Sequence, residues 1–257
     1  MITAALKDLR EYCRAEGAVL LHVCVVGSRA YGYHAPQSDL DLRFVYAFPA
    51  ERYFSLTSVP DELALPTGDV VGYELGKFLS MLRRNGCNAV EILQAPTICS
   101  EYPEFLSELR ELGRWYFACG CAVHSLLGGA GTYVRRLRYL PTADRGSDRE
   151  RKLLLGAIRL MSAARYILER NEPYPLSFRD LISSVELEPE RSEILALAES
   201  RRLDQPLTDE LLVAPRAFCE FLRDVLGSME PCAQEMKSPQ RAEEFYYRVV
   251  TSLGQHS

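Results

Sequence analysis

The sequence lacks the features typical of secreted, membrane-spanning and zinc-binding proteins. It has no run close to the roughly 20 apolar residues that a membrane helix needs. Its start, MITAALKDLREYCRAEGA, has no basic segment followed by an apolar one, as a signal peptide would have. None of its eight cysteines forms a CxxC pair, and only four histidines are present, which excludes the usual zinc sites. We therefore expect a cytoplasmic protein with reduced cysteines and no contact with membranes.

An excess of positive charge is also missing. The chain of 257 residues has 30 lysines and arginines against 35 acidic residues, a net charge of -5. A strongly basic nucleic-acid-binding protein would differ, so any contact with a polynucleotide must be local. Two segments are candidates, YVRRLRYL at 133–140 and DRERKLLL at 148–155, where Tyr133 and Tyr139 alternate with arginines. Helices with a solvated charged face give the same pattern.

The hydrophobic pattern divides the chain near residue 100. The first part mixes periods of two and of 3.6 residues, which predicts α+β structure, and the second part is almost wholly helical. We expect domains at 1–100 and 101–257. The predicted strands are 18–28, 39–48 and 69–75, and 58–68 is expected to be a loop. The predicted helices are 3–16, 76–86, 88–96, several within 103–140, 147–171, 190–202, 208–227 and 239–253.

One stretch, VVGSRAYGYHAPQSDLDLR at 25–43, has the composition of a phosphate and metal site. Asp39 and Asp41, two residues apart on a strand, would point to the same face, and Mg2+ prefers such carboxylate oxygens. Gly27 would let a phosphate approach the backbone, and Ser28 could donate to it. A lone DxD in a solvent-facing strand is usually a solvated charge pair. The Gly-Ser pair eleven residues upstream of Asp39 favours the catalytic interpretation.

GSRAYG and SDLDLR resemble the hG[GS] … [DE]x[DE] signature of the DNA polymerase beta nucleotidyltransferase superfamily. More narrowly, the chain is similar to the RNA repair pathway DNA polymerase beta family. Two further segments carry this likeness, YELGKFLSMLRRNGCNAVEILQAP at 73–96 and RKLLLGAIRLMSAARYI at 151–167. The chain departs from the family pattern at Gly86, where members commonly have proline, which alters a turn and no ligand.

The resemblance implies an α+β nucleotidyltransferase core with a mixed sheet, followed by a helical C-terminal domain. It also implies a third carboxylate on a neighbouring strand, which Asp69 matches best. Glu74 is the alternative, although at the head of a helix it could be a capping residue. Asp39, Asp41 and Asp69 would hold two Mg2+ or Mn2+ ions, and Gly27 and Ser28 would bind the β- and γ-phosphates.

Four basic residues are expected near the nucleotide: Arg29, Lys77, Lys152 and Arg159. The alternatives are a salt bridge to an aspartate for Arg29, and solvated helix positions for the other three. We expect Arg43 to balance the charge of the aspartates. Asn88 and Glu91, three apart on a helix, are expected to form a buried pair that braces the active-site strands. His22 and His124 are expected in the core.

The implied activity is that of an enzyme of EC 2.7.7 type. It would transfer a nucleoside monophosphate from a nucleoside triphosphate to a hydroxyl group and release pyrophosphate. The family name makes an RNA or DNA end the first expectation for the acceptor. A protein side chain, as in AMPylating enzymes, is the alternative acceptor. A catalytically inactive nucleotide-binding scaffold is an alternative of a different class.

Overall fold

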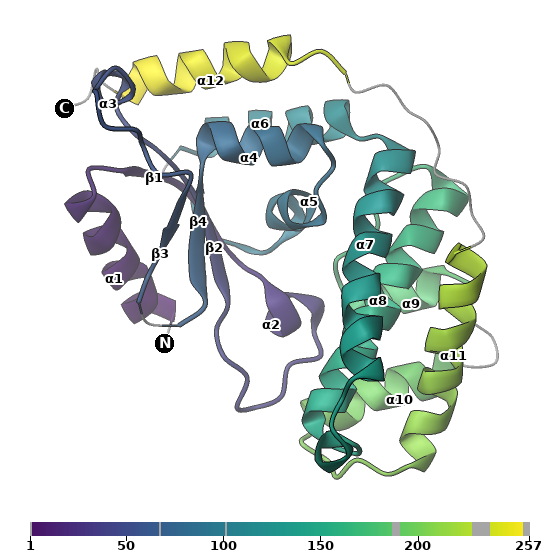
Figure 1. Cartoon of the computed structure of the whole chain (residues 1–257). Coiled ribbons are helices and arrows are strands. Elements are labelled where there is room, and N and C mark those ends of the chain that lie inside the picture. Colours follow the sequence, from purple (N-terminus) through teal and green to yellow (C-terminus); the bar gives the residue numbers. More distant parts are fainter. Residues whose placement is uncertain (1, 67, 101, 187–190, 228–236, 254–257) are drawn as a thin grey trace. The chain divides into compact units, whose positions relative to one another are not determined.

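The computed structural model describes residues 2–66, 68–100, 102–186, 191–227 and 237–253. It shows an α+β protein with a mixed sheet, as predicted. The sheet has five strands in the order β3-β4-β2-β1-β5 (Figure 1). The strands are β1 (Val19–Val25), β2 (Leu42–Ala47), β3 (Glu62–Ala64), β4 (Val70–Glu74) and β5 (Thr97–Cys99). Two of them, β3 and β5, were not predicted. Each has three residues, too few for a hydrophobic period to show.

The chain forms two compact units. Unit 1 comprises residues 1–27, 39–116 and 236–257, and unit 2 comprises 28–38 and 117–235. The helices of unit 1 are α1 (Ile2–Ala15), α3 (Ala50–Tyr53), α4 (Leu75–Arg83), α5 (Cys87–Gln94), α6 (Pro103–Tyr116) and α12 (Gln240–Leu253). Those of unit 2 are α7 (Cys119–Arg138), the 3-10 turn η1 (Thr142–Asp144), α8 (Asp148–Arg170), α9 (Phe178–Ser184), α10 (Arg191–Arg202) and α11 (Glu210–Gly227). The short α2 (Gly27–Tyr31) begins in one unit and ends in the other.

This division differs from the predicted boundary at residue 100. Helices α6 and α12 belong with the sheet, and their contact includes the edge-to-face packing of Phe105 on Phe245. The segment 28–38, although it connects two strands, belongs with the helices. The hydrophobic pattern indicates whether a segment is a helix or a strand, but not which other segments it packs against. The prediction therefore placed the boundary at residue 100, before α6, although α6 packs with the sheet.

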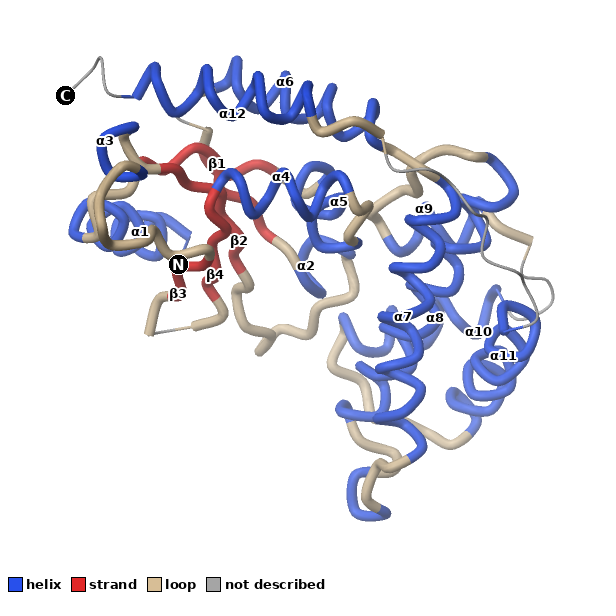
Figure 2. Tube along the Cα trace, turned by 45° about the horizontal axis from the view of Figure 1, so that its top comes forward, coloured by secondary structure: helices blue, strands red, loops and turns tan. Residues whose placement is uncertain are grey.

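The sheet of unit 1 is covered on both faces (Figures 1 and 2). On one face, Leu42, Phe44 and Tyr46 of β2 pack in the same cluster as Leu9 and Cys13 of α1. Helices α4 and α5 lie on the other side of the sheet, and Figure 2 shows them opposite α1. Because both faces are covered, β1 and β2 are almost continuously buried, and alternation alone could not set their bounds. The strand predicted from residue 39 in fact begins at Leu42.

Gly72 in β4 provides space for the ring of Phe44 on β2, its lateral partner. A Cβ at Gly72 would lie 2.1 Å from a ring carbon of Phe44, whose side chain is fully buried. We expect Gly72→Ala to lower the free energy of unfolding by about 1–3 kcal/mol, the usual cost of overpacking a core. Urea denaturation measures this. Gly128→Ala is the control, because a Cβ there meets nothing within 4 Å. Equal stability of the two variants would contradict the prediction.

His22 lies in the core of unit 1, as predicted, with 1% of its surface exposed. Burial, to which the nearby Arg110 adds, lowers the pKa of His22 from 6.5 to about 4. The unfolded chain therefore binds a proton near pH 6.5 that the folded protein does not accept until about pH 4. The contribution of the neutral His22 to the free energy of unfolding is fully present above pH 6.5. It is lost as the pH falls from 6.5 to about 4, by about 3 kcal/mol in total.

Urea denaturation of the wild type at pH 7.5, 5.5 and 4.5 measures this loss. In His22→Gln the dependence on pH between 6.5 and 4 should be much reduced. We predicted His124 to lie in the core, but the structure places it at an exposed position of α7. The substitution His124→Gln is therefore the control. A wild type equally stable at pH 7.5 and 4.5 would refute the assignment.

Unit 2 is built around α8, whose residues from Leu153 to Ala164 are all buried. A helix that is buried on all sides lies inside a bundle, and α7, α9, α10 and α11 pack against α8 (Figure 2). Gly156 allows a close approach, because a Cβ there would meet the ring of Tyr133 on α7 at 2.5 Å. No single helix among the described residues is long and apolar enough to cross a membrane; only α6 and α7 taken together have that length and composition.

Candidate functional site

Three chain segments of unit 1 meet at one edge of the sheet. Strand β1 runs antiparallel to β2 with Val25 opposite Leu42, and β2 runs parallel to β4 with Leu42 opposite Val70. The end of β1 and the starts of β2 and β4 therefore coincide. The amide of Val26 donates to the carbonyl of Asp41 at 3.0 Å, and the amide of Leu42 donates to the carbonyl of Asp69 at 2.9 Å. The turn at Gly27 and two of the predicted carboxylates are thus adjacent.

Gly27 occupies a position that only glycine fits. Its φ is +69°, in the left-handed region that other residues rarely adopt. A Cβ at this position would lie 2.2 Å from Oδ2 of Asp41. The carboxylate of Asp41 therefore lies directly against the backbone of the Gly-Ser turn. The glycine required by the sequence motif and the aspartate fourteen residues later form one local structure.

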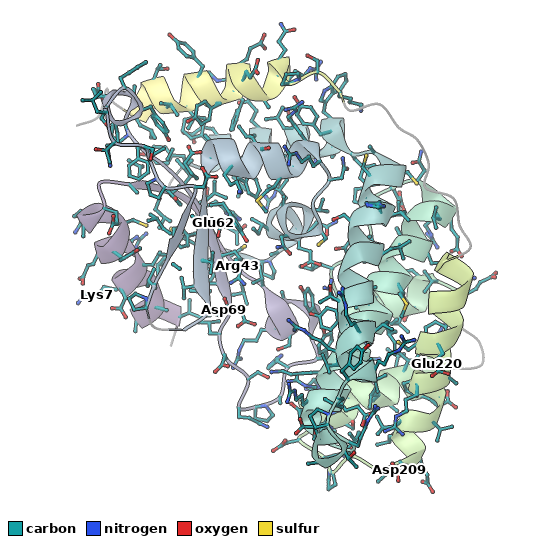
Figure 3. All side chains as sticks on the ribbon, in the orientation of Figure 1. Lys7, Arg43, Glu62, Asp69, Asp209 and Glu220 are labelled. Carbon is teal, nitrogen blue, oxygen red and sulfur yellow. The ribbon has the colours of Figure 1, made fainter. Side chains whose placement is uncertain are left out.

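Asp69 stands beside Asp41 at the start of β4, and its carboxylate is held by Arg43. The Nη1 atom of Arg43 lies 2.9 Å from Oδ1 of Asp69 and also donates to the Asp69 carbonyl at 3.1 Å. Figure 3 labels both side chains on the sheet of unit 1. Laterally paired residues of a parallel sheet point to the same face, which explains why Arg43, two positions beyond Asp41, reaches Asp69. We predicted that Arg43 balances Asp39 and Asp41, whereas the ion pair in the structure is with Asp69.

Glu74, the alternative third carboxylate, lies at the opposite end of β4. It caps α4, accepting from the amides of Gly76 at 2.6 Å and Lys77 at 3.2 Å, and it also accepts from the hydroxyls of Tyr53 and Tyr246. Burial raises the pKa of this carboxyl, and these hydrogen bonds oppose that effect. The role of Glu74 is that of a helix cap.

The chemistry of the donor set fits a divalent cation, since the carboxylates at this edge are hard oxygen ligands. Asp39 is exposed and Asp41 half-buried, and both precede β2 instead of lying within it. Across the part of the chain that the structure describes, no three His, Cys, Asp or Glu side chains are placed as a ligand set. At this edge, Asp69 faces Arg43. The backbone therefore brings Asp41 and Asp69 to one edge, where the side chain of Asp69 pairs with Arg43.

The predicted basic residues are distributed over the molecule. Arg29, one residue after Ser28, donates to the carbonyl of Ser38 at 2.7 Å and so closes the segment 28–38. Lys77 lies beyond the opposite end of β4, which is about 17 Å along the strand from Asp69, and pairs with Asp61 at 3.4 Å. The structure does not bring Lys77 to the carboxylate edge.

The other two predicted basic residues lie on α8 of unit 2. Lys152 is exposed, whereas Arg159 is buried with 4% of its surface accessible. The guanidinium of Arg159 lies 3.8 Å from the ring centre of Tyr31, in the segment that follows the Gly-Ser turn. Arg159 therefore contacts this segment through a cation-π interaction.

A second buried arginine, Arg201 of α10, holds the same segment and was missed by the sequence analysis. Its Nη1 donates to the carbonyl of Tyr33 at 2.7 Å, and its Nη2 to Oγ of Ser38 at 3.3 Å. The same guanidinium pairs with Asp148 at 3.1 Å, and Asp148 also pairs with the buried Arg151. Burial raises the pKa of Asp148, but the two arginines outweigh it and hold the pKa below its usual value. Nothing in the sequence separates Arg201 from its exposed neighbour Arg202.

We expect Arg201→Met to lower the free energy of unfolding by about 2 kcal/mol or more, because buried partners of a charged donor lose their hydrogen bonds. Arg202→Met is the matched control. Arg202 pairs with Glu199 on the surface, and such pairs contribute at most about 1 kcal/mol. Urea denaturation of both variants measures the difference. A loss of equal size in both would show that Arg201 does not hold the segment.

We predicted that Asn88 and Glu91 form a buried pair, and this prediction is wrong for Asn88. Asn88 is exposed, while Glu91 is buried. The buried asparagine is Asn85, whose φ is +53° and whose side chain donates to the carbonyl of Tyr116 at 3.0 Å. Asparagine is one of the few residues that tolerate this backbone conformation, so the turn after α4 explains its presence. The bracing contact links that turn to α6.

The family described as the RNA repair pathway DNA polymerase beta family matches residues 1–246. The chain belongs to this family. It is 24% identical over 238 residues to the uncharacterized protein YcgL of Bacillus subtilis (strain 168), covering 91% of this chain and 88% of that protein. A crystal structure of a nucleotidyltransferase-like protein from Exiguobacterium sibiricum 255-15 aligns over 97% of this chain and 79% of its own, with 14% identity and a TM-score of 0.36.

Membership of the polymerase beta family agrees with the architecture of unit 1. The family match covers the Gly-Ser turn, the aspartates and the helices that follow. The family therefore suggests a nucleotidyltransferase.

Proposed function

We propose that the protein is a metal-dependent nucleotidyltransferase that moves a nucleoside monophosphate from a nucleoside triphosphate to a hydroxyl group. The observation that carries the proposal is the meeting of Gly27, Asp41 and Asp69 at one sheet edge, with the Asp41 carboxylate against the Gly27 backbone. Family membership supports it independently. A bare turn beside carboxylates suits a triphosphate, whose negative charge requires cations in order to approach them.

Each residue at the edge has a role in this proposal. Gly27 leaves room for the carboxylate of Asp41 against the turn, and Ser28 offers a hydroxyl and an amide to the β- and γ-phosphates. Asp39, Asp41 and Asp69 would hold Mg2+ or Mn2+. When bound, the ions would stabilise charge on the transferring phosphoryl group and lower the pKa of the acceptor hydroxyl. Arg43 keeps the Asp69 carboxylate at the edge and neutralises it while no cation is present.

The transfer balances without a further reactant. The acceptor oxygen forms a bond to the α-phosphorus, the bond between that phosphorus and the bridging oxygen breaks, and pyrophosphate leaves. The proton of the hydroxyl passes to solvent. An RNA or DNA end is the acceptor that we propose first, in line with the family name.

The test is an assay with each α-labelled nucleoside triphosphate, Mg2+ or Mn2+, and one acceptor per reaction. Acceptors are RNA and DNA oligonucleotides with free 3′-hydroxyl ends and, separately, a mixture of proteins. The expected result is label on an oligonucleotide and one pyrophosphate released per nucleotide transferred. Label on protein alone would replace the acceptor by an amino-acid side chain. Binding of nucleotide without transfer to any acceptor would overturn the proposal in favour of a scaffold.

A further inference from the structure

The connection between α7 and α8 concentrates positive charge in an acidic chain. Residues 133–155 contain seven arginines and lysines against three acidic residues, whereas the whole chain has more acids than bases. This segment includes the last turn of α7, the turn η1 and the first turns of α8, at the lower end of these helices in Figure 1. The local excess is therefore confined to one end of unit 2.

The three acidic side chains of this segment are already paired with arginines. The pairs are Asp144 with Arg149 at 2.7 Å, Asp148 with Arg151 at 2.9 Å and with Arg201 at 3.1 Å, and Glu150 with Arg216 at 2.8 Å and with Arg145 at 3.3 Å. Glu150 is fully buried. The acids of the segment are thus engaged by these five arginines, and none of them pairs with Arg135, Arg136, Arg138 or Lys152.

Four exposed basic side chains remain: Arg135, Arg136, Arg138 and Lys152. None of them forms an ion pair with a described residue. Tyr139 stands next to them with 75% of its surface exposed. A pocket of about 350 Å³ adjoins them; its charged lining consists of Arg138, Arg145, Arg216, Glu150 and Glu220. We call Arg135, Arg136, Arg138, Tyr139 and Lys152 the basic surface.

Helix electrostatics explains only part of this surface. Arginines in the last turn of α7 interact favourably with the negative end of its dipole. Lys152 is the fifth residue of α8, beyond the first turn with its Asp148 and Glu150, so the dipole does not account for it. The dipole also leaves the exposed ring of Tyr139 unexplained.

We propose that the basic surface binds single-stranded nucleic acid, its cations contacting phosphates and Tyr139 stacking on a base. Closely spaced cations match the regular charge of a phosphodiester backbone, and an exposed aromatic ring beside them suits an unpaired base. This inference rests on the proposed function and specifies it further. It names nucleic acid, and not protein, as the class of acceptor.

The test is fluorescence anisotropy of a labelled 12-nucleotide RNA with the full chain, without nucleoside triphosphate or metal. Wild-type affinity should fall steeply with salt. In Arg135→Gln/Arg136→Gln/Arg138→Gln, the slope of log K against log salt should shrink by about 2, and affinity should drop at least tenfold. Tyr139→Ala should weaken binding at least about fivefold with the slope unchanged.

Arg14→Gln/Arg84→Gln, at exposed positions of unit 1, is the control and should bind like the wild type. Thermal melting checks folding, and the single variants Arg136→Gln and Lys152→Gln serve if the triple variant unfolds. Salt-independent wild-type binding, or equal effects in the control, would overturn the proposal. Polyglutamate competing as well as RNA, with Tyr139→Ala unaffected, would assign the surface to an acidic protein instead. The assay measures RNA binding and does not require nucleotidyl transfer. Its outcome can therefore be interpreted even if the proposed enzyme activity is not found.

Discussion

Asp41→Asn is expected to reduce nucleotidyl transfer by about a thousandfold or more. The substitution keeps the size of the side chain that lies against Gly27 and removes its charge, and with it a ligand for divalent cations. Metal-ion stabilisation of a transferring phosphoryl group is worth several kcal/mol, and each 1.4 kcal/mol corresponds to a factor of ten in rate. Initial rates of label transfer at saturating Mn2+ measure the effect.

Asp8→Asn, at an exposed position of α1, is the control and should retain wild-type rates. Thermal melting should show that Asp41→Asn folds, since Asp41 is only half-buried. The alanine variants Asp39→Ala and Asp41→Ala should be as impaired. Transfer by Asp41→Asn within tenfold of the wild type would remove this carboxylate from the proposed site.

Gly27→Ala is expected to lower transfer by at least about a hundredfold, with a smaller effect on stability. The added methyl group would lie 2.2 Å from Oδ2 of Asp41, so either the turn or the carboxylate must move. A displacement of about 1 Å in a positioned group costs on the order of a hundredfold in rate. The positive φ of +69° adds strain for any residue with a Cβ, of about 1 kcal/mol or more.

Gly17→Ala separates these two effects. Gly17 has nearly the same backbone conformation, with φ of +72°, but a Cβ there meets nothing within 4 Å. Both variants should lose similar stability from strain, and only Gly27→Ala should lose activity. Steady-state kinetics together with urea denaturation provide the comparison. If Gly27→Ala retains transfer, the turn does not position Asp41 for chemistry.

The sequence predicted a Gly-Ser turn after an apolar strand, and Gly27 has the positive φ that favours glycine. It placed Asp39 and Asp41 within a strand, whereas β2 begins only at Leu42. The choice of Asp69 over Glu74 rested on the family pattern. The parallel register of β2 and β4 now places Asp69 beside Asp41 and Glu74 at the far end. That register depends on the pairing of distant segments, which no local pattern contains.

The basic residues illustrate the limit of sequence spacing. Lys77 follows β4 directly, but the strand carries it to the opposite edge of the sheet, where Asp61 pairs with it. Arg201 was indistinguishable from Arg202 in the sequence, yet one is fully buried against Tyr33 and the other lies on the surface. Burial of an arginine is decided by which carbonyls and carboxylates surround it after folding, so tertiary structure alone could identify Arg201.

The sequence by itself determined the α+β class and most of the strands and helices, because hydrophobic period and backbone preference act within a few residues. Its motifs also indicated the family. The tertiary structure decided which segments belong together. It assigned 28–38 to the helical unit, where Arg201 bonds Tyr33 and Ser38, and α6 and α12 to the sheet. These assignments follow from packing and buried hydrogen bonds between residues far apart in the chain, which only folding brings into contact.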